Sequence, residues 1–261
     1  MAIDIEIKDG VGELIINAPP VNALDNAGWK EFAEKLTALG QNEDVNCVVI
    51  RAIGKGFQCG VDVKELAADG SLIVELNKGC FDSFAAVYDC PVPTISAVNG
   101  FCIGGGLGIA GASDFVIAAD DSTYCLPEVD RGALGAATHL MRMVGVQKAR
   151  RMLYTCETID AQELFSLGGC TEVVPAAELH AKALEVARQI ASKSPMALRL
   201  GKQALNGIEL LEPKTSYRYE QGFTLELYTT PDSQEARDAF VEKRDAKFDR
   251  FRRRERDAKF D

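Results

Sequence analysis

The spacing of apolar and polar positions predicts a β-hairpin at the start of the chain and a helix after it. Apolar and polar residues alternate over 3–7, and a second apolar segment covers 13–17, with the turn dipeptide Asp9-Gly10 between them. From 27 to 39 the apolar positions recur at helical spacing, which predicts an amphipathic helix. The apolar positions of this helix are Trp29, Phe32, Leu36 and Leu39.

Strand and helix patterns then alternate along the first half of the chain. Buried strands are predicted at 47–52, 94–98 and 115–118, and helices at 71–89 and 107–111. Repeated strand–helix–strand units predict a parallel sheet with helices outside it. After position 136 the pattern is almost entirely helical, broken by a short Glu172-Val-Val, with no linker before it. We therefore expect an α/β core followed by helices better suited to covering a partner subunit than to folding alone.

Three consecutive glycines, Gly104 to Gly106, stand where a predicted strand gives way to a predicted helix. The free N–H groups of a helix N-terminus attract negative charge, and glycine lets a ligand approach the bare backbone. A glycine-rich turn needed only for tight helix packing explains the triplet equally well. The triplet alone does not choose between an anion site and a packing turn.

Two further segments strengthen the functional interpretation. Gly56-Phe-Gln-Cys-Gly-Val-Asp-Val-Lys-Glu-Leu precedes the glycines, and Leu126-Pro-Glu-Val-Asp-Arg-Gly follows them. In this order the three segments resemble the motifs F-x-x-G-x-D-[IV]-K-E, N-G-x-x-x-G-G-G and P-E-[IV]-x-x-G of the crotonase (enoyl-CoA hydratase/isomerase) superfamily. Similar segments at Pro20-Val-Asn-Ala-Leu and Ala239-Phe-Val-Glu-Lys-Arg extend the resemblance over nearly the whole chain. It implies a ββα spiral core over 1–190 and a helical C-terminal region over 191–261 used in trimerisation.

The resemblance implies an acyl-CoA substrate whose thioester oxygen is held by the backbone N–H groups of Val61 and Gly105. Such preorganised donors stabilise a developing oxyanion by about 3–4 kcal/mol each at the upper end. Coenzyme A would be part of the substrate, and no separate cofactor, flavin or metal is implied. The implied CoA-binding residues are Ala23, Cys59, Gly60, Val61, Asp62, Lys243 and Arg244. Asp62 is also well placed to cap a predicted helix that begins at 63, a structural role.

The acid–base residues differ from those of the superfamily's hydratases, which use two glutamates. This sequence has Gly108 at the first position and Glu128 at the second. Because paired carboxylates hold the reacting water between them, a single one disfavours simple hydration of an enoyl-CoA. Asp130 is a second candidate for water activation, and the candidate supporting residues are Arg131, His139 and Glu220. Cys102 and Cys125 are interpreted as small buried hydrophobic residues.

A narrower resemblance indicates chemistry that needs one base. The segments 78–90, 126–140 and 217–227 are similar to bacterial crotonase-type hydrolases that open a ring of a steroid-derived methyl-dioxo-indene carboxyl-CoA. There, water adds to the five-ring ketone and a C–C bond breaks, leaving an enolate for the oxyanion hole. Two alternatives remain: an enoyl-CoA isomerase or hydratase acting on another acyl-CoA, and a non-catalytic acyl-CoA binder.

Composition narrows the partners and the compartment. The formal net charge of −10 disfavours nucleic acid as a ligand, although 243–256 is locally basic and the hexapeptide of 244–249 recurs at 256–261. No apolar run approaches the roughly 20 residues that cross a bilayer. Eight cysteines without a C-x-x-C pair indicate reduced thiols in the cytoplasm, and two histidines do not suffice for a rich metal site. We expect a homotrimer or a dimer of trimers.

Overall fold

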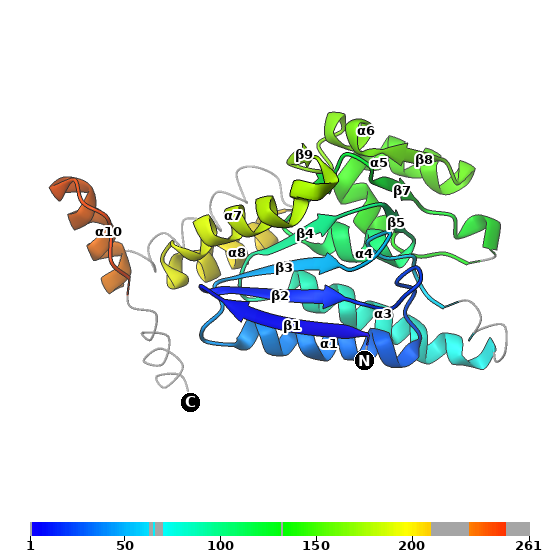
Figure 1. Cartoon of the computed structure of the whole chain (residues 1–261), viewed down its shortest axis with the longest axis horizontal. Helices are drawn as coiled ribbons and strands as arrows, with labels where there is room; N and C mark the ends of the chain where they lie inside the picture. Colours follow the sequence, from blue (N-terminus) through cyan, green and yellow to red (C-terminus); the bar gives the residue numbers. More distant parts are fainter. Residues whose placement is uncertain (1, 63–64, 66–69, 132, 210–229, 249–261) are drawn as a thin grey trace.

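A six-stranded sheet with the strand order β1-β2-β3-β4-β6-β9 forms the centre of the computed structural model (Figure 1). The structure describes residues 2–62, 65, 70–131, 133–209 and 230–248. β1 and β2 pair antiparallel, and all other neighbours in this sheet are parallel, so the predicted hairpin and parallel sheet are confirmed. The strands are β1 (Ile3–Lys8), β2 (Val11–Ile16), β3 (Cys47–Ala52), β4 (Thr94–Val98), β6 (Phe115–Ala119) and β9 (Glu172–Val174).

Helices cover both faces of this sheet, as predicted. Two apolar cores lie on opposite faces of the sheet. One contains Val48 of β3 and residues of α1 (Asn26–Gln41), α3 (Ile73–Tyr88) and α4 (Gly105–Ala112). The other contains Val49 of β3 and residues of α7 (Leu179–Ala191). Successive side chains of a strand point to opposite faces, and both faces are buried here. The apolar run of β3 follows from this double burial.

A second sheet, which the sequence pattern did not predict, contains three short strands in the order β5-β7-β8. They are β5 (Phe101–Ile103), β7 (Thr123–Cys125) and β8 (Thr158–Asp160). β5 follows β4 directly, so this sheet lies beyond the carboxyl end of the central one (Figure 1). The Gly104 N–H donates to the Cys125 carbonyl oxygen over 3.1 Å and fixes the start of α4 to β7. The carboxyl edge of a parallel sheet is where ligand sites commonly form.

The second half of the chain is mainly helical, as expected, with β8 and β9 as interruptions. Its remaining helices are α5 (Ala137–Thr155), α6 (Ala161–Ser166), α8 (Pro195–Ile208) and α10 (Pro231–Glu242), and 3₁₀ turns occupy η1 (Gly70–Leu72), η2 (Val129–Arg131) and η3 (Ala176–Glu178). The buried Lys202 ammonium pairs with Asp114 over 2.7 Å, which fixes α8 to its own chain. The boundary predicted at 190 falls at the end of α7, and a trimerisation role for 191–261 stays a prediction.

Candidate active site

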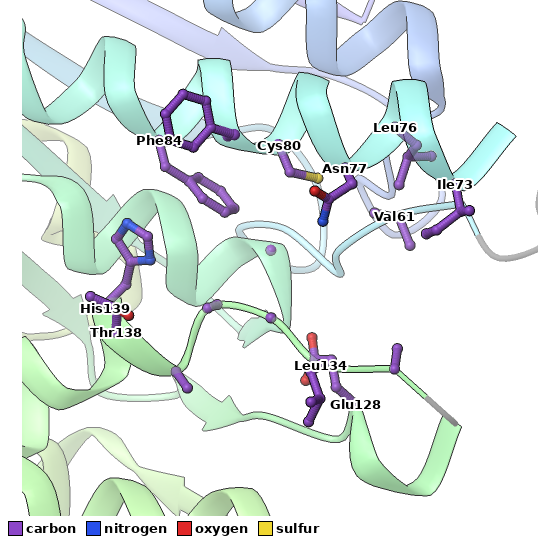
Figure 2. Close-up of a pocket in the computed structure, with 16 residues that line it drawn as sticks. Val61, Ile73, Leu76, Asn77, Cys80, Phe84, Glu128, Leu134, Thr138 and His139 are labelled. Carbon is purple, nitrogen blue, oxygen red and sulfur yellow. The ribbon is translucent and has the colours of Figure 1, made fainter.

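A mainly apolar cleft of about 480 Å³ opens between α3 and the loop that precedes α5. Figure 2 shows α3 side chains on one side and Glu128 and Leu134 on the other. The side chains that α3 contributes are Ile73, Leu76, Asn77, Cys80, Phe81 and Phe84. Among the described lining residues Glu128 is the only carboxylate.

Two backbone amides predicted to bind a thioester oxygen, those of Val61 and Gly105, both lie in the lining of this cleft. Val61 forms a parallel bridge with Leu24, and this pairing uses the Gly60 carbonyl and the Asp62 N–H. The N–H of Val61 itself therefore points away from Leu24. Gly105 is the first residue of α4, and an N–H at this position of a helix has no intrahelical acceptor. A Cβ on Gly60 would lie 3.4 Å from the Gly105 nitrogen, which places the two segments side by side.

Gly104 brings the Glu128 carboxylate close to these amides. It has φ +57° and ψ −113°, a conformation that favours glycine, and it caps α4. A Cβ at this position would lie 2.5 Å from Glu128 Oε1. Glu128 lies in the turn between β7 and η2, and its backbone carbonyl accepts from the Ala133 N–H over 2.9 Å. The absence of a side chain at 104 thus lets a carboxylate approach the N-terminus of a helix.

An aromatic cluster borders the same cleft. The Trp29 ring is fully buried and meets the Phe84 ring edge-on, with centroids 5.7 Å apart at 86°. The Trp29 ring carbon Cζ2 would lie 2.7 Å from a Cβ on Gly105, so the indole packs directly under the amide site. On its other side Phe84 contacts the His139 ring at 4.9 Å.

His139, predicted as a supporting residue, lies in the first turn of α5 and lines the cleft. Its Nδ1 atom is buried and has no hydrogen-bond partner in the described part of the chain. Burial first, and then the positive charge of Arg142, lower the pKa of His139. The neutral imidazole is therefore favoured at neutral pH.

Of the other predicted acid–base and supporting residues, only the side chain of Asp130 can be placed. Asp130 is exposed in η2 and does not line the cleft. The backbone of Arg131 also belongs to η2, while its side chain and all of Glu220 lie outside the described residues. Within the described part, the structure therefore brings Glu128 and His139, but not Asp130, to the cleft.

The predicted CoA-binding residues fall into two groups. The first group lies at the edge of the cleft. The bridge between Leu24 and Val61 brings Ala23, which precedes Leu24, close to the segment that contains Cys59, Gly60 and Asp62. The second group, Lys243 and Arg244, follows α10, which lies on the opposite side of the molecule from β5 and β7 (Figure 1). Arg244 forms ion pairs with Glu235 and Glu242. The pKa of Glu235 is lowered to about 2, chiefly by the hydrogen bond that Arg244 donates to it. Within one chain the basic pair does not reach the cleft, and its role stays a prediction. The helix predicted to begin at 63 lies mainly outside the described residues.

The interpretation of Cys102 and Cys125 as buried hydrophobic residues agrees with the structure, because both are buried free thiols. Burial raises the pKa of Cys102, and burial also raises the pKa of Cys80, at the cleft wall, to about 12. The protonated thiol is therefore the stable form of Cys102 and of Cys80, so neither of these two is an activated nucleophile.

A survey of the described residues finds no cluster of three or more histidine, cysteine, aspartate or glutamate side chains that could hold a metal ion. Among the helices described, none combines the length and the apolar character that a membrane span requires.

Most of the chain matches a known family. Residues 6–251 match the family model described as enoyl-CoA hydratase/isomerase, and the chain belongs to this family. A solved structure with a similar fold is an enoyl-CoA hydratase from Bacillus anthracis, which is 30% identical with a TM-score of 0.90 over 95% of this chain and 99% of that one. This likeness confirms the predicted crotonase-type fold.

Among curated relatives, two are 48% identical to this chain. Both are named (7aS)-7a-methyl-1,5-dioxo-2,3,5,6,7,7a-hexahydro-1H-indene-carboxyl-CoA hydrolase. The match to the Rhodococcus jostii protein covers 90% of this chain and 92% of the relative, and that to the Mycobacterium tuberculosis protein covers 90% and 96%. A Clostridium acetobutylicum short-chain-enoyl-CoA hydratase is 31% identical over 92% of this chain and 94% of the relative. These matches confirm that the chain is similar to the indene-carboxyl-CoA hydrolases, as the narrower resemblance of the sequence indicated.

Sequence reasoning missed the residues that form the apolar wall of the cleft. They recur along α3 at intervals of three and four positions, which is the spacing of one helix face. Phe81, on this face, is 69% exposed. A second apolar stripe on a predicted helix was the signal that could have located this wall.

Proposed function

We propose that this protein hydrolyses a C–C bond and opens a ring of a steroid-derived indene-dione carboxyl-CoA. One observation carries the proposal: Glu128 alone among the described lining residues supplies a carboxylate beside the Val61 and Gly105 amides. A cleft of about 480 Å³ with mainly apolar walls suits a compact bicyclic acyl group. The relatives named for this hydrolysis support the same substrate class.

In the proposed mechanism Glu128 activates the water. Its carboxylate takes one proton while the water oxygen forms a bond to the ketone carbon of the five-membered ring. The resulting tetrahedral alkoxide collapses to a carboxylic acid, and the C–C bond to the ring-junction carbon breaks. The protonated Glu128 can then return its proton to the carbon that receives the electron pair, so one carboxylate serves both steps.

The two amides act on the electron pair that the broken bond releases. That pair is conjugated through the ring alkene to the thioester, so negative charge develops on the thioester oxygen. The N–H groups of Val61 and Gly105 are fixed before the reaction by the Leu24 bridge and by the start of α4. Preorganised donors of this kind lower the barrier because they need not reorient as charge develops.

A panel of acyl-CoA substrates tests the proposal. The protein is incubated with the indene-dione carboxyl-CoA, a 3-enoyl-CoA and crotonyl-CoA, and the products are followed by mass. We expect only the first to gain one water with opening of a ring. The single carboxylate also suits an isomerase that shuttles one proton, and faster turnover of the 3-enoyl-CoA would establish that alternative. Binding without turnover of any substrate would identify a non-catalytic acyl-CoA binder.

We also propose a homotrimer or a dimer of trimers in the cytoplasm. Lys243 and Arg244 directly follow α10, which lies at the far end of the molecule from β5 and β7 (Figure 1), so we expect any contact with CoA phosphates to be made by a neighbouring copy. Sedimentation at micromolar concentration should give the mass of three or six chains. A stable monomer that still binds acyl-CoA at full strength would rule out this arrangement.

A further inference from the structure

The space over Gly108 is filled by the ring of Phe84. Gly108 is buried in α4, and a Cβ built on it would lie 2.6 Å from Phe84 Cε2 and closer still to two other atoms of that ring. Carbon atoms in contact normally lie about 3.5–4.0 Å apart. Any side chain at 108 therefore requires Phe84 to move.

Phe84 has little room to move without entering the cleft. Its ring lies between those of Trp29 and His139. Trp29 is in turn fixed to α3, because the Ser83 hydroxyl donates to its carbonyl oxygen over 2.9 Å, and a Cβ added at Gly79 would lie only 3.1 Å from the Trp29 Cβ. The open side of the Phe84 ring faces the cleft, since Phe84 is part of its lining. Displacing the ring would therefore use the space of the acyl group.

We infer that Phe84 is the specificity-determining residue of this site. Its ring excludes a second carboxylate at 108, so Glu128 acts alone and paired-carboxylate hydration is suppressed. The same ring supplies a flat aromatic wall for a cyclic acyl group. The statement about the acyl group rests on the proposed function, whereas the exclusion of a side chain at 108 does not.

A thermal-stability cycle tests the exclusion. In a helix interior alanine is normally more favourable than glycine, so Gly→Ala should raise the melting temperature. We expect Gly108→Ala to lower it by roughly 4 °C or more, because the new methyl group meets the Phe84 ring. In the Phe84→Ala background the same change should raise it. Gly201→Ala is the matched control, since Gly201 lies within α8 and a Cβ there would meet nothing within 4 Å.

Hydration of crotonyl-CoA tests the effect on specificity. Gly108→Glu alone should stay at the background rate of the unmodified protein, and Gly108→Glu with Phe84→Ala should exceed it at least tenfold. Equal rates in the single and double variants would overturn the inference, as would a folded double variant that gains nothing. If the double variant does not fold, the stability cycle decides, and a higher melting temperature for Gly108→Ala alone would overturn the exclusion.

The same samples separate this inference from the proposed function. Failure of the unmodified protein to open the indene-dione carboxyl-CoA would defeat the proposed function. The reversed sign of Gly108→Ala in the Phe84→Ala background would still establish that Phe84 closes the space at 108. Ring opening with no such reversal would retain the function and discard the role of Phe84.

Discussion

Glu128→Gln is expected to reduce the rate of ring opening by roughly 10²–10⁴-fold, the usual contribution of a positioned acid or base. The amide keeps the shape of the side chain next to Gly104 but cannot accept the proton of the attacking water. Acyl-CoA binding should stay near its original strength, because the proposed contacts to the thioester come from backbone N–H groups, which the substitution leaves in place. Single-turnover kinetics together with a titration of acyl-CoA binding would measure the two quantities separately.

Asp130→Asn is the matched control for this prediction. Asp130 lies two positions further along the chain, is exposed, and does not contribute to the described cleft lining. Its substitution should therefore change the ring-opening rate little. A nearly inactive Asp130→Asn variant beside an active Glu128→Gln variant would assign water activation to Asp130 instead.

Gly104→Ala is expected to reduce turnover by about 10²-fold, the loss that a misplacement of about 1 Å can cause at a catalytic group. The new methyl group would lie 2.5 Å from Glu128 Oε1 and would push the carboxylate away from the two amides. The variant should stay folded, because the strain of a sparsely populated backbone conformation costs only about 1–3 kcal/mol. The turnover rate and the melting temperature of the purified variant test these two statements.

A control for backbone conformation alone is Gly168→Ala. Gly168 has φ +79° and a Cβ there would meet nothing within 4 Å, so the change introduces strain without a collision. It should lower the melting temperature while turnover of the folded protein is retained. If the two variants lose the same fraction of turnover, the collision with Glu128 is not the cause.

The long elements of the fold could be predicted because each has a clear periodicity and a local boundary. The hairpin turns at Asp9-Gly10, and the helix from 26 begins where the Asp25 carboxylate accepts from the Gly28 N–H over 2.7 Å. The strands of the small sheet have three residues each, which is too short for an alternating pattern to be recognised. Their positions depend on pairing with distant segments, such as β7 with β8.

The site divides in the same way between local and long-range features. Val61, Gly105 and Glu128 could be placed because each belongs to a motif with fixed spacing. Gly108 was recognised as a departure from the hydratase pattern, yet the ring that occupies the space beside it comes from Phe84 on another helix. A contact between α3 and α4 depends on how the two helices pack, which no pattern within either helix specifies.

Trp29 gives the protein a built-in optical reporter. It is the only tryptophan in the sequence, so all indole fluorescence of the chain originates from one ring. That ring packs beneath Gly105 and against the edge of Phe84, and no solvent reaches it. A thioester bound at the Gly105 amide changes the electric field at this indole. Binding of an acyl-CoA can therefore be followed by stopped-flow emission without an attached dye, and the binding and chemical steps can be timed separately on unlabelled protein.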